Sequence, residues 1–176
     1  MTAPEFSRTV RIDTLGDGPR TLAIEADEAE RAALAERFGY VAIDRLSAEV
    51  ALTRKGEAVS ARGTVRAALS QSCVVTGEAV REEIEEPFEV EFRPQPALAG
   101  AEEEIELGGS ELDVVFYDGA TVDVGEAIAE TLSLSVDPYP RSAAAEAALR
   151  AAGVRSEEEA ARESSPFAAL KDKLGK

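Results

Sequence analysis

The chain has 176 residues, 44% of them hydrophobic, which suffices for one domain with a buried core. It has no histidine, no tryptophan and one cysteine, which excludes a histidine-based catalytic triad, a zinc site and a disulfide within the chain, so we expect a non-enzymatic protein without a cofactor. The formal charge of −16 repels phosphates at long range, which excludes a general nucleic-acid binder and requires any RNA contact to be local.

The first part of the chain predicts two strands and a helix. Residues 8–13 alternate apolar and polar side chains, and a turn-rich link leads to a second strand around residues 22–24. Asp27 and Glu30 offer a capping box for a helix that stops at Gly39. The N-terminus lacks the features of a signal peptide, and no run approaches the roughly 20 apolar residues of a membrane span, so we expect a cytoplasmic protein.

The clearest strand pattern follows. Apolar residues occupy even positions over residues 46–53 and mostly odd positions over residues 59–75, which predicts a β-hairpin. A turn centred on Lys55 and Gly56 would pair Leu52 with Val59. A second turn at Gly77 leads to a strand whose apolar face holds Val80, Ile84, Phe88, Val90 and Phe92, and whose other face holds Glu83, Glu85, Glu89 and Glu91.

Basic side chains face that acidic row. The second turn would place Arg66 opposite Glu89 and Arg62 opposite Arg93. Residues 78–123 hold 15 acids and 2 bases, so most of the negative charge lies in this part of the chain. Two interpretations remain for the nearby basic residues, either contact with RNA phosphates or ion pairs with the acidic row. The candidates for RNA contact here are Arg54, Lys55, Arg62 and Arg66.

Cys73 is expected on the inward face of its strand, next to the second turn. A thiol with no histidine and no basic neighbour has no reason for a lowered pKa, so we interpret it as a buried structural residue and not as a nucleophile. The carboxylates on one strand face are typical of a solvated surface, and they single out no acid–base pair.

The most strongly signalled helix begins at Asp123, whose side chain can cap the first amides. Glu126 is three residues on and is expected to reach back to the cap, as in a capping box, and to face water together with Glu130. The opposite face is an apolar stripe of Val124, Ala127, Ile128 and Leu132, which is typical of a helix packed on a sheet.

Pro138 ends this helix, and Tyr139 lies between two prolines. The simpler interpretation is a helix terminus without a function of its own. The second interpretation is a docking edge for a partner, made by Tyr139 and Arg141.

These elements predict an α+β fold, with an antiparallel sheet that is open or partly closed like a barrel, two packed helices and a flexible C-terminal tail. Residues 1–140 would form a single domain, with a flexible acidic loop at residues 94–104 and strands at residues 105–107 and 112–117. Residues 141–176 would form a mobile helical tail, with one helix in the alanine-rich residues 143–152.

The tail ends in a short amphipathic motif. Phe167, Leu170 and Leu174 recur at helical spacing after Pro166, and so short a helix orders only against a partner or against its own domain. We expect the motif to be mobile in the free protein and to dock Phe167 and Leu170 on a partner, and self-docking is the alternative. The basic residues expected near phosphate in that complex are Lys171, Lys173 and Lys176.

Three stretches resemble the YceD family of bacterial and plastid proteins, described as large ribosomal RNA subunit accumulation proteins. They are the strand that ends in Cys73, residues 112–140, and the ending Ser-Pro-Phe-Ala-Ala-Leu-Lys at residues 165–171, which is similar to the family pattern Asn-Pro-Phe-Ala-x-Leu. Many members have Cys-x-x-Cys at the first stretch. Thr76 stands at the second position here, so no metal or redox role is carried over to Cys73.

The resemblance implies a cytoplasmic, non-enzymatic ribosome-biogenesis factor that supports the synthesis, processing or stability of 23S ribosomal RNA of the large subunit. The implied partner is that RNA or its precursor, contacted directly or through a ribosomal protein or maturation factor, with no membrane and no DNA. The residues leave an alternative open, an acidic adaptor or chaperone for a basic protein partner unrelated to ribosomes. Its surface would be the acidic row together with residues 102–104.

Overall fold

The computed structural model describes residues 4–16, 18–96 and 113–155. The chain divides into two compact units, and each is described by itself. Unit 1 consists of residues 1–71 and 81–138, and unit 2 of residues 72–80 and 139–176. None of the helices in the described ranges has the length and apolar character that crossing a membrane requires. The strand predicted at residues 105–107, most of the acidic loop and the terminal docking motif lie outside the described residues.

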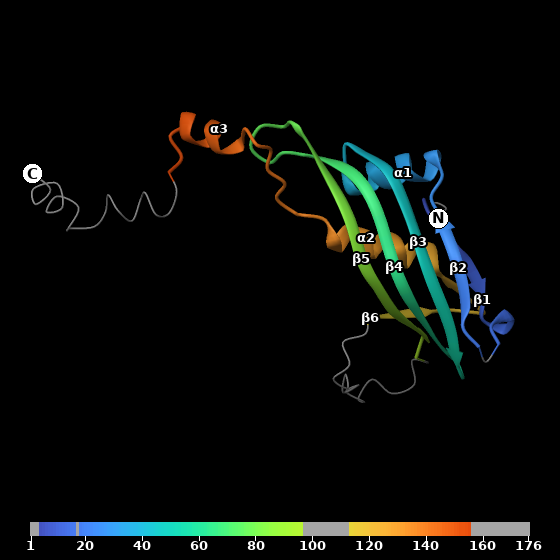
Figure 1. Ribbon diagram of the computed structural model, residues 1–176. Helices are drawn as coiled ribbons and strands as arrows, with labels where there is room; N and C mark the ends of the chain where they lie inside the picture. Colours follow the sequence, from blue (N-terminus) through green and yellow to red (C-terminus); the bar gives the residue numbers. More distant parts are fainter. Residues whose placement is uncertain (1–3, 17, 97–112, 156–176) are drawn as a thin grey trace, which may run out of the picture. The chain divides into compact units, whose positions relative to one another are not determined.

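A five-stranded sheet forms the framework of unit 1 (Figure 1). In spatial order its strands are β2 (Arg20–Glu25), β3 (Ala42–Lys55), β4 (Ala58–Ser72), β5 (Ala79–Pro94) and β6 (Asp113–Tyr117), and the ends of β4 and β5 at their shared turn belong to unit 2. The α+β prediction is therefore confirmed. The sheet is not closed into a barrel and not wholly antiparallel, because β6 pairs with β5 in parallel.

The hairpin of β3 and β4 turns at Gly56 and Glu57, one residue later than predicted. Lys55 pairs with Ala58, so Leu52 pairs with Ala61, and the predicted pairing of Leu52 with Val59 is wrong. Gly56 has a φ of +64°, which suits it to the first position of this two-residue turn. The predicted faces survive because the pairing moves by two residues, which is the period of a strand.

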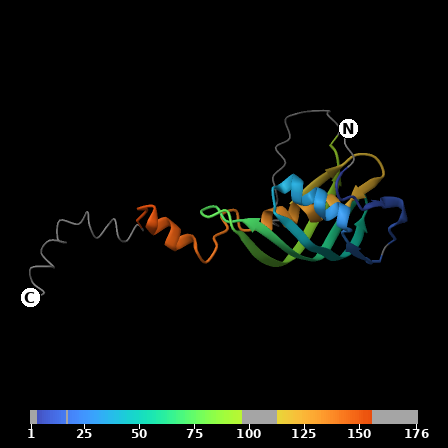
Figure 2. The ribbon, with the colours of Figure 1, turned by 90° about the horizontal axis from the view of Figure 1, so that it is seen from above.

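One core joins the sheet to two helices. The apolar side chains predicted to point inward from β3, β4 and β5 are buried, apart from Val80 at the start of β5, which is only partly covered. Figure 2 shows that α1 (Glu28–Phe38) and α2 (Val124–Ser135) lie on the same face of the curved sheet. The apolar stripe of α2 is buried, as its spacing predicts. No helix of the described part of unit 1 covers the opposite face of the sheet.

The capping box of α1 is confirmed. The Asp27 carboxylate accepts the backbone N–H of Glu30 at 2.9 Å, and Glu30 accepts the backbone N–H of Asp27 at 2.9 Å. The helix ends at Gly39, whose φ of +72° closes a left-handed cap.

The capping box predicted for α2 is only half present. Asp123 accepts the N–H groups of Gly125 and Glu126 at 3.0 and 3.3 Å, but Glu126 does not return to the cap. It binds both terminal nitrogens of Arg37 on α1, at 2.7 and 3.1 Å, and its side chain is 31% exposed, so Glu126 faces water only in part. The Arg37 guanidinium gives Glu126 two charge-assisted hydrogen bonds, whereas the backbone of Asp123 would give it one hydrogen bond from a neutral amide.

The residues before the first strand pack against the start of α2. β1 (Thr9–Arg11) pairs with β7 (Thr121–Asp123), and it is shorter than the predicted strand because η1 (Ile12–Thr14) follows as a 3-10 turn. Phe6 is fully buried, and the Ser7 hydroxyl and the Arg8 amide both donate to the Asp123 carboxylate, at 2.5 and 2.8 Å. The N-terminal segment is therefore part of the core.

Candidate functional site

The basic side chains of β4 form ion pairs with acidic residues on both neighbouring strands. Arg66 lies 3.0 Å from Glu85 on β5 and 3.8 Å from Glu49 on β3. Arg62 lies 2.6 Å from Glu89 on β5. The sheet therefore places these arginines among carboxylates, which agrees with the interpretation that they form ion pairs with the acidic row.

The individual pairs differ from the predicted ones. Arg66 was expected opposite Glu89 and Arg62 opposite Arg93, and both pairings are wrong, because each arginine meets a glutamate four residues earlier on β5. The turn explains the shift. The Cys73 amide donates to the Glu78 carbonyl at 2.7 Å, so the turn between β4 and β5 lies earlier in the chain than predicted. An earlier turn pairs each residue of β4 with an earlier residue of β5.

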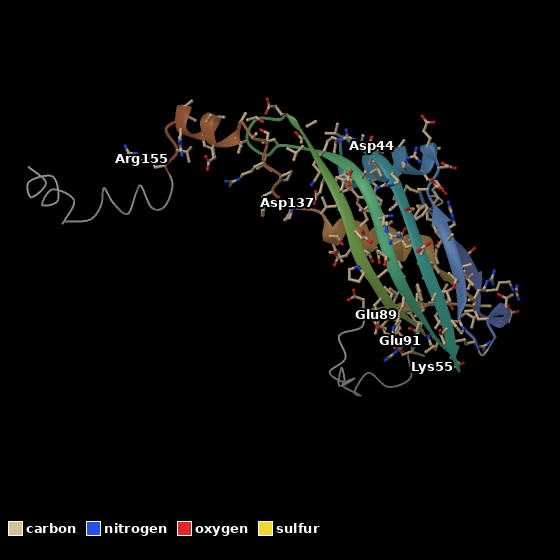
Figure 3. The ribbon with its side chains drawn as sticks, viewed as in Figure 1. Asp44, Lys55, Glu89, Glu91, Asp137 and Arg155 are labelled. Carbon is tan, nitrogen blue, oxygen red and sulfur yellow. The ribbon has the colours of Figure 1, made fainter. Side chains whose placement is uncertain are left out.

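Two further basic residues lie at the end of β3. The Arg54 guanidinium donates to the carbonyls of Gly56 and Ile12, at 2.8 and 3.1 Å, so it braces the hairpin. Lys55 is exposed, and Figure 3 shows it at the tip of the sheet, beyond Glu89 and Glu91. Of the four basic side chains predicted on the sheet, that of Lys55 alone has no hydrogen bond or ion pair within the described part of the chain.

The most distinctive chemical group is Cys73, in the turn of unit 2. Its thiol is 3% exposed, so the prediction of burial is confirmed. Three backbone N–H groups point at its Sγ, from Ser142 at 3.2 Å and from Val75 and Thr76 at 3.4 Å each. The Thr76 and Ser142 hydroxyls hydrogen-bond each other at 3.1 Å. The turn and residues 140–142 are thus held together around one sulfur.

The expectation of an ordinary thiol is wrong. The Ser142 amide, followed by the Thr76 hydroxyl and the nearer turn amides, lowers the pKa of Cys73 to about 6, against the opposing effect of burial. Hydrogen-bond donors stabilise a thiolate as a basic neighbour would, and the strongest of them is 69 residues away in the sequence.

The donor set around Cys73 does not fit a metal ion. Thr76 stands where a Cys-x-x-Cys pair would have its second thiolate, and its hydroxyl is already hydrogen-bonded. No group of three or more histidine, cysteine, aspartate and glutamate side chains arranged to hold a metal occurs among the described residues. We therefore derive no metal chemistry from this turn.

The predicted docking edge lies in unit 2, next to the Cys73 turn. Tyr139 is 71% exposed and Val74 is 53% exposed, and the Val74 amide donates to the carbonyl of Pro140 at 2.9 Å. Arg141 is exposed. The predicted alanine-rich helix is confirmed as α3 (Ala145–Ala151). Tyr139, Val74 and Arg141 thus gather around one short segment, whereas Phe167, Leu170, Lys171 and Lys173 lie outside the described residues.

Sequence reasoning missed a groove between β5 and α2. Its lining includes Glu86, Pro87, Asp113 and Leu134, and Leu134 is 82% exposed. One sequence signal was available, because Glu86 holds an even position on a strand whose other even positions are largely apolar. The exposure of Leu134 had no such signal, since an outward leucine on a helix is common.

One comparison with known proteins identifies the family. The family model described as "Large ribosomal RNA subunit accumulation protein YceD" matches residues 61–172, which is more than half of the chain. No curated protein and no solved structure gives a match. The matched range contains Cys73, most of β4, all of β5 and α2, and the docking edge. This chain belongs to the YceD family of large ribosomal RNA subunit accumulation proteins.

Proposed function

We propose that this protein is a non-enzymatic, cytoplasmic biogenesis factor that supports the accumulation of 23S ribosomal RNA of the large ribosomal subunit. The observation that carries this proposal is the family match over residues 61–172. A factor of this kind acts by binding, either to the RNA or its precursor or to a ribosomal protein or maturation factor that handles it.

The charge distribution favours a protein as the main contact. Arg62 and Arg66 are neutralised by glutamates, and the protein carries a net charge of −16, so phosphates are repelled except at local cationic points. We assign direct RNA contact to Lys55 with Arg54 at the hairpin tip, and to Lys171 and Lys173. Docking to the partner falls to Tyr139 and Arg141, and to Phe167 and Leu170.

Depletion of the protein in its source organism tests the role. The amount of 23S relative to 16S ribosomal RNA should fall, and the wild-type gene should restore it. An unchanged ratio in a clean deletion grown under several conditions would refute the proposal.

Complementation with variants tests the assigned residues. Tyr139→Ala with Arg141→Ala should fail to restore the ratio, whereas Val154→Ala, at a position that is 52% exposed in the same unit, should restore it. Lys55→Glu should weaken recovery of RNA with the protein, and Arg20→Glu, an exposed position on β2, should not.

A pull-down with and without ribonuclease separates this function from the alternative. Large-subunit proteins and ribosomal RNA in the eluate support the proposal. One basic protein without RNA would instead indicate an adaptor or chaperone unrelated to ribosomes, acting through the acidic row.

A further inference from the structure

A groove opens on unit 1 between the middle of β5 and the C-terminal half of α2. Its volume is about 390 Å³, which lies at the lower end of the ~300–1,000 Å³ found for ligand pockets, so it suits a few side chains better than a folded surface. The lining residues come from three elements, and they are Glu86, Pro87, Asp113, Thr131, Leu134 and Ser135.

The groove exists because the helix layer stops short of this part of the sheet. Ile84 and Phe88 point inward from β5 and are buried, whereas Glu86, between them on the same face, is exposed. Leu134 on α2 is 82% exposed, and Pro87 is exposed beside Glu86. Two apolar side chains are therefore left without a cover among the described residues.

The neighbouring edge of β5 is also open in the described part of the chain. β6 pairs with β5 only from Val90 to Pro94, so residues 81–89 have a strand on one side alone (Figure 1). Pro87 interrupts this edge and the glutamates charge it, and both devices hinder pairing with another sheet. The edge is protected against sheet-to-sheet association while the groove beside it stays accessible.

The hydroxyl groups that line the groove form hydrogen bonds within the helix, whereas the carboxylates have no partner among the described residues. The Thr131 and Ser135 hydroxyls donate to helix carbonyls at 2.9 and 2.8 Å. The carboxylates of Glu86 and Asp113 have no hydrogen bond or ion pair within the described ranges, and neither has the carboxylate of Glu130, which is exposed four residues before Leu134 on the same helix face. The groove thus offers an apolar contact inside an uncompensated acidic rim.

We propose that this groove binds an extended segment of a partner protein in which one apolar side chain stands between lysine or arginine residues. The apolar side chain packs on Leu134 and Pro87, and the basic ones reach Glu86, Asp113 and Glu130. RNA does not fit, because its phosphates would meet the acidic rim. A second copy of this chain does not fit either, because a symmetric contact would bring two acidic rims together.

Photo-crosslinking identifies the occupant. The probe is a synthetic peptide with a central leucine flanked on each side by three lysine or arginine residues, and the crosslinker is benzoylphenylalanine incorporated in place of Leu134 in the full chain. The matched control carries it in place of Val41, which is 58% exposed and also lies near acidic residues of unit 1. Crosslinks from position 134 to the peptide, and few from position 41, support the proposal. Crosslinks from position 134 to a second copy, or to residues 156–176 or 97–112 of the same chain, overturn it.

Affinity measurements test the chemistry. Glu86→Lys with Glu130→Lys should weaken binding of the peptide about tenfold, because two attractive contacts become repulsive. Glu36→Lys with Glu57→Lys changes the net charge equally at exposed positions elsewhere and should change the affinity less than twofold. Replacing the central leucine by serine should also weaken binding. Equal losses in both charge variants, or no effect of the leucine, would show nonspecific attraction and overturn the proposal. The assay does not involve ribosomal RNA, so its failure leaves the proposed function standing.

Discussion

Replacing Gly125 by alanine gives opposite expectations from the helix alone and from the folded chain. Gly125 lies in the first turn of α2, where alanine is favoured over glycine by up to about 1 kcal/mol in a helix. In the structure, a Cβ on this residue would lie 2.7 Å from the Arg8 nitrogen and 2.7 Å from the Phe6 carbonyl oxygen. Both are backbone atoms, so no side-chain rotation relieves the contact.

The N-terminal segment must therefore shift or α2 must move. Overpacking of this kind costs about 1–3 kcal/mol, and displacing the segment also weakens the hydrogen bonds from Ser7 and Arg8 to Asp123 and uncovers Phe6. After subtraction of the gain in helix propensity, we expect a net loss of about 2 kcal/mol in the free energy of unfolding. For a chain of this size that corresponds to a fall in Tm of about 4–8 °C.

Urea unfolding followed by circular dichroism measures the effect, with the m-value expected to stay constant. Two controls isolate the cause. In a peptide of residues 121–138 the same replacement should raise the helical content, and in a chain that lacks residues 1–8 it should become neutral or stabilising. A Gly125→Ala protein as stable as the wild type would show that residues 6–8 do not press on α2.

Three further predictions concern other parts of the chain. Gly63→Ala would place a Cβ 1.8 Å from the Glu49 carbonyl oxygen, so we expect either insoluble protein or a loss of at least about 3 kcal/mol in the free energy of unfolding, measured in urea. Stability close to that of the wild type would contradict the packing of β3 on β4. Absorbance at 240 nm should show the Cys73 thiolate titrating near pH 6. Because the thiol of the unfolded chain titrates at about 8.5, the free energy of unfolding should rise with pH between these two values, and this contribution should be lost as the pH falls through 6. Thr76→Val should raise the midpoint of the titration, and an unchanged midpoint would reject the role of the hydroxyl. Deleting residues 160–176 should leave Tm almost unchanged while abolishing association with pre-ribosomal particles, and a large loss of stability with association intact would reject the docking motif.

The sequence by itself determined the elements whose signals lie within a few residues. Alternation identified the buried faces of β3, β4 and β5, and the spacing of Asp27 and Glu30 identified the capping box of α1. Such patterns survive because strand pleating and helix caps depend on near neighbours. The family resemblance was also legible in the sequence, and the family match confirms it.

The tertiary structure decided the features that join residues far apart in the chain. Glu126 leaves its own cap for Arg37 on another helix, Gly125 is needed because the N-terminal segment lies against it, and Ser142 lowers the pKa of Cys73 across 69 residues. The groove at Leu134 depends on where the helix layer ends over the sheet. No local pattern encodes these contacts, because which distant groups become neighbours follows from the packing of the whole core and from strand registers, which move by two residues when a turn moves by one.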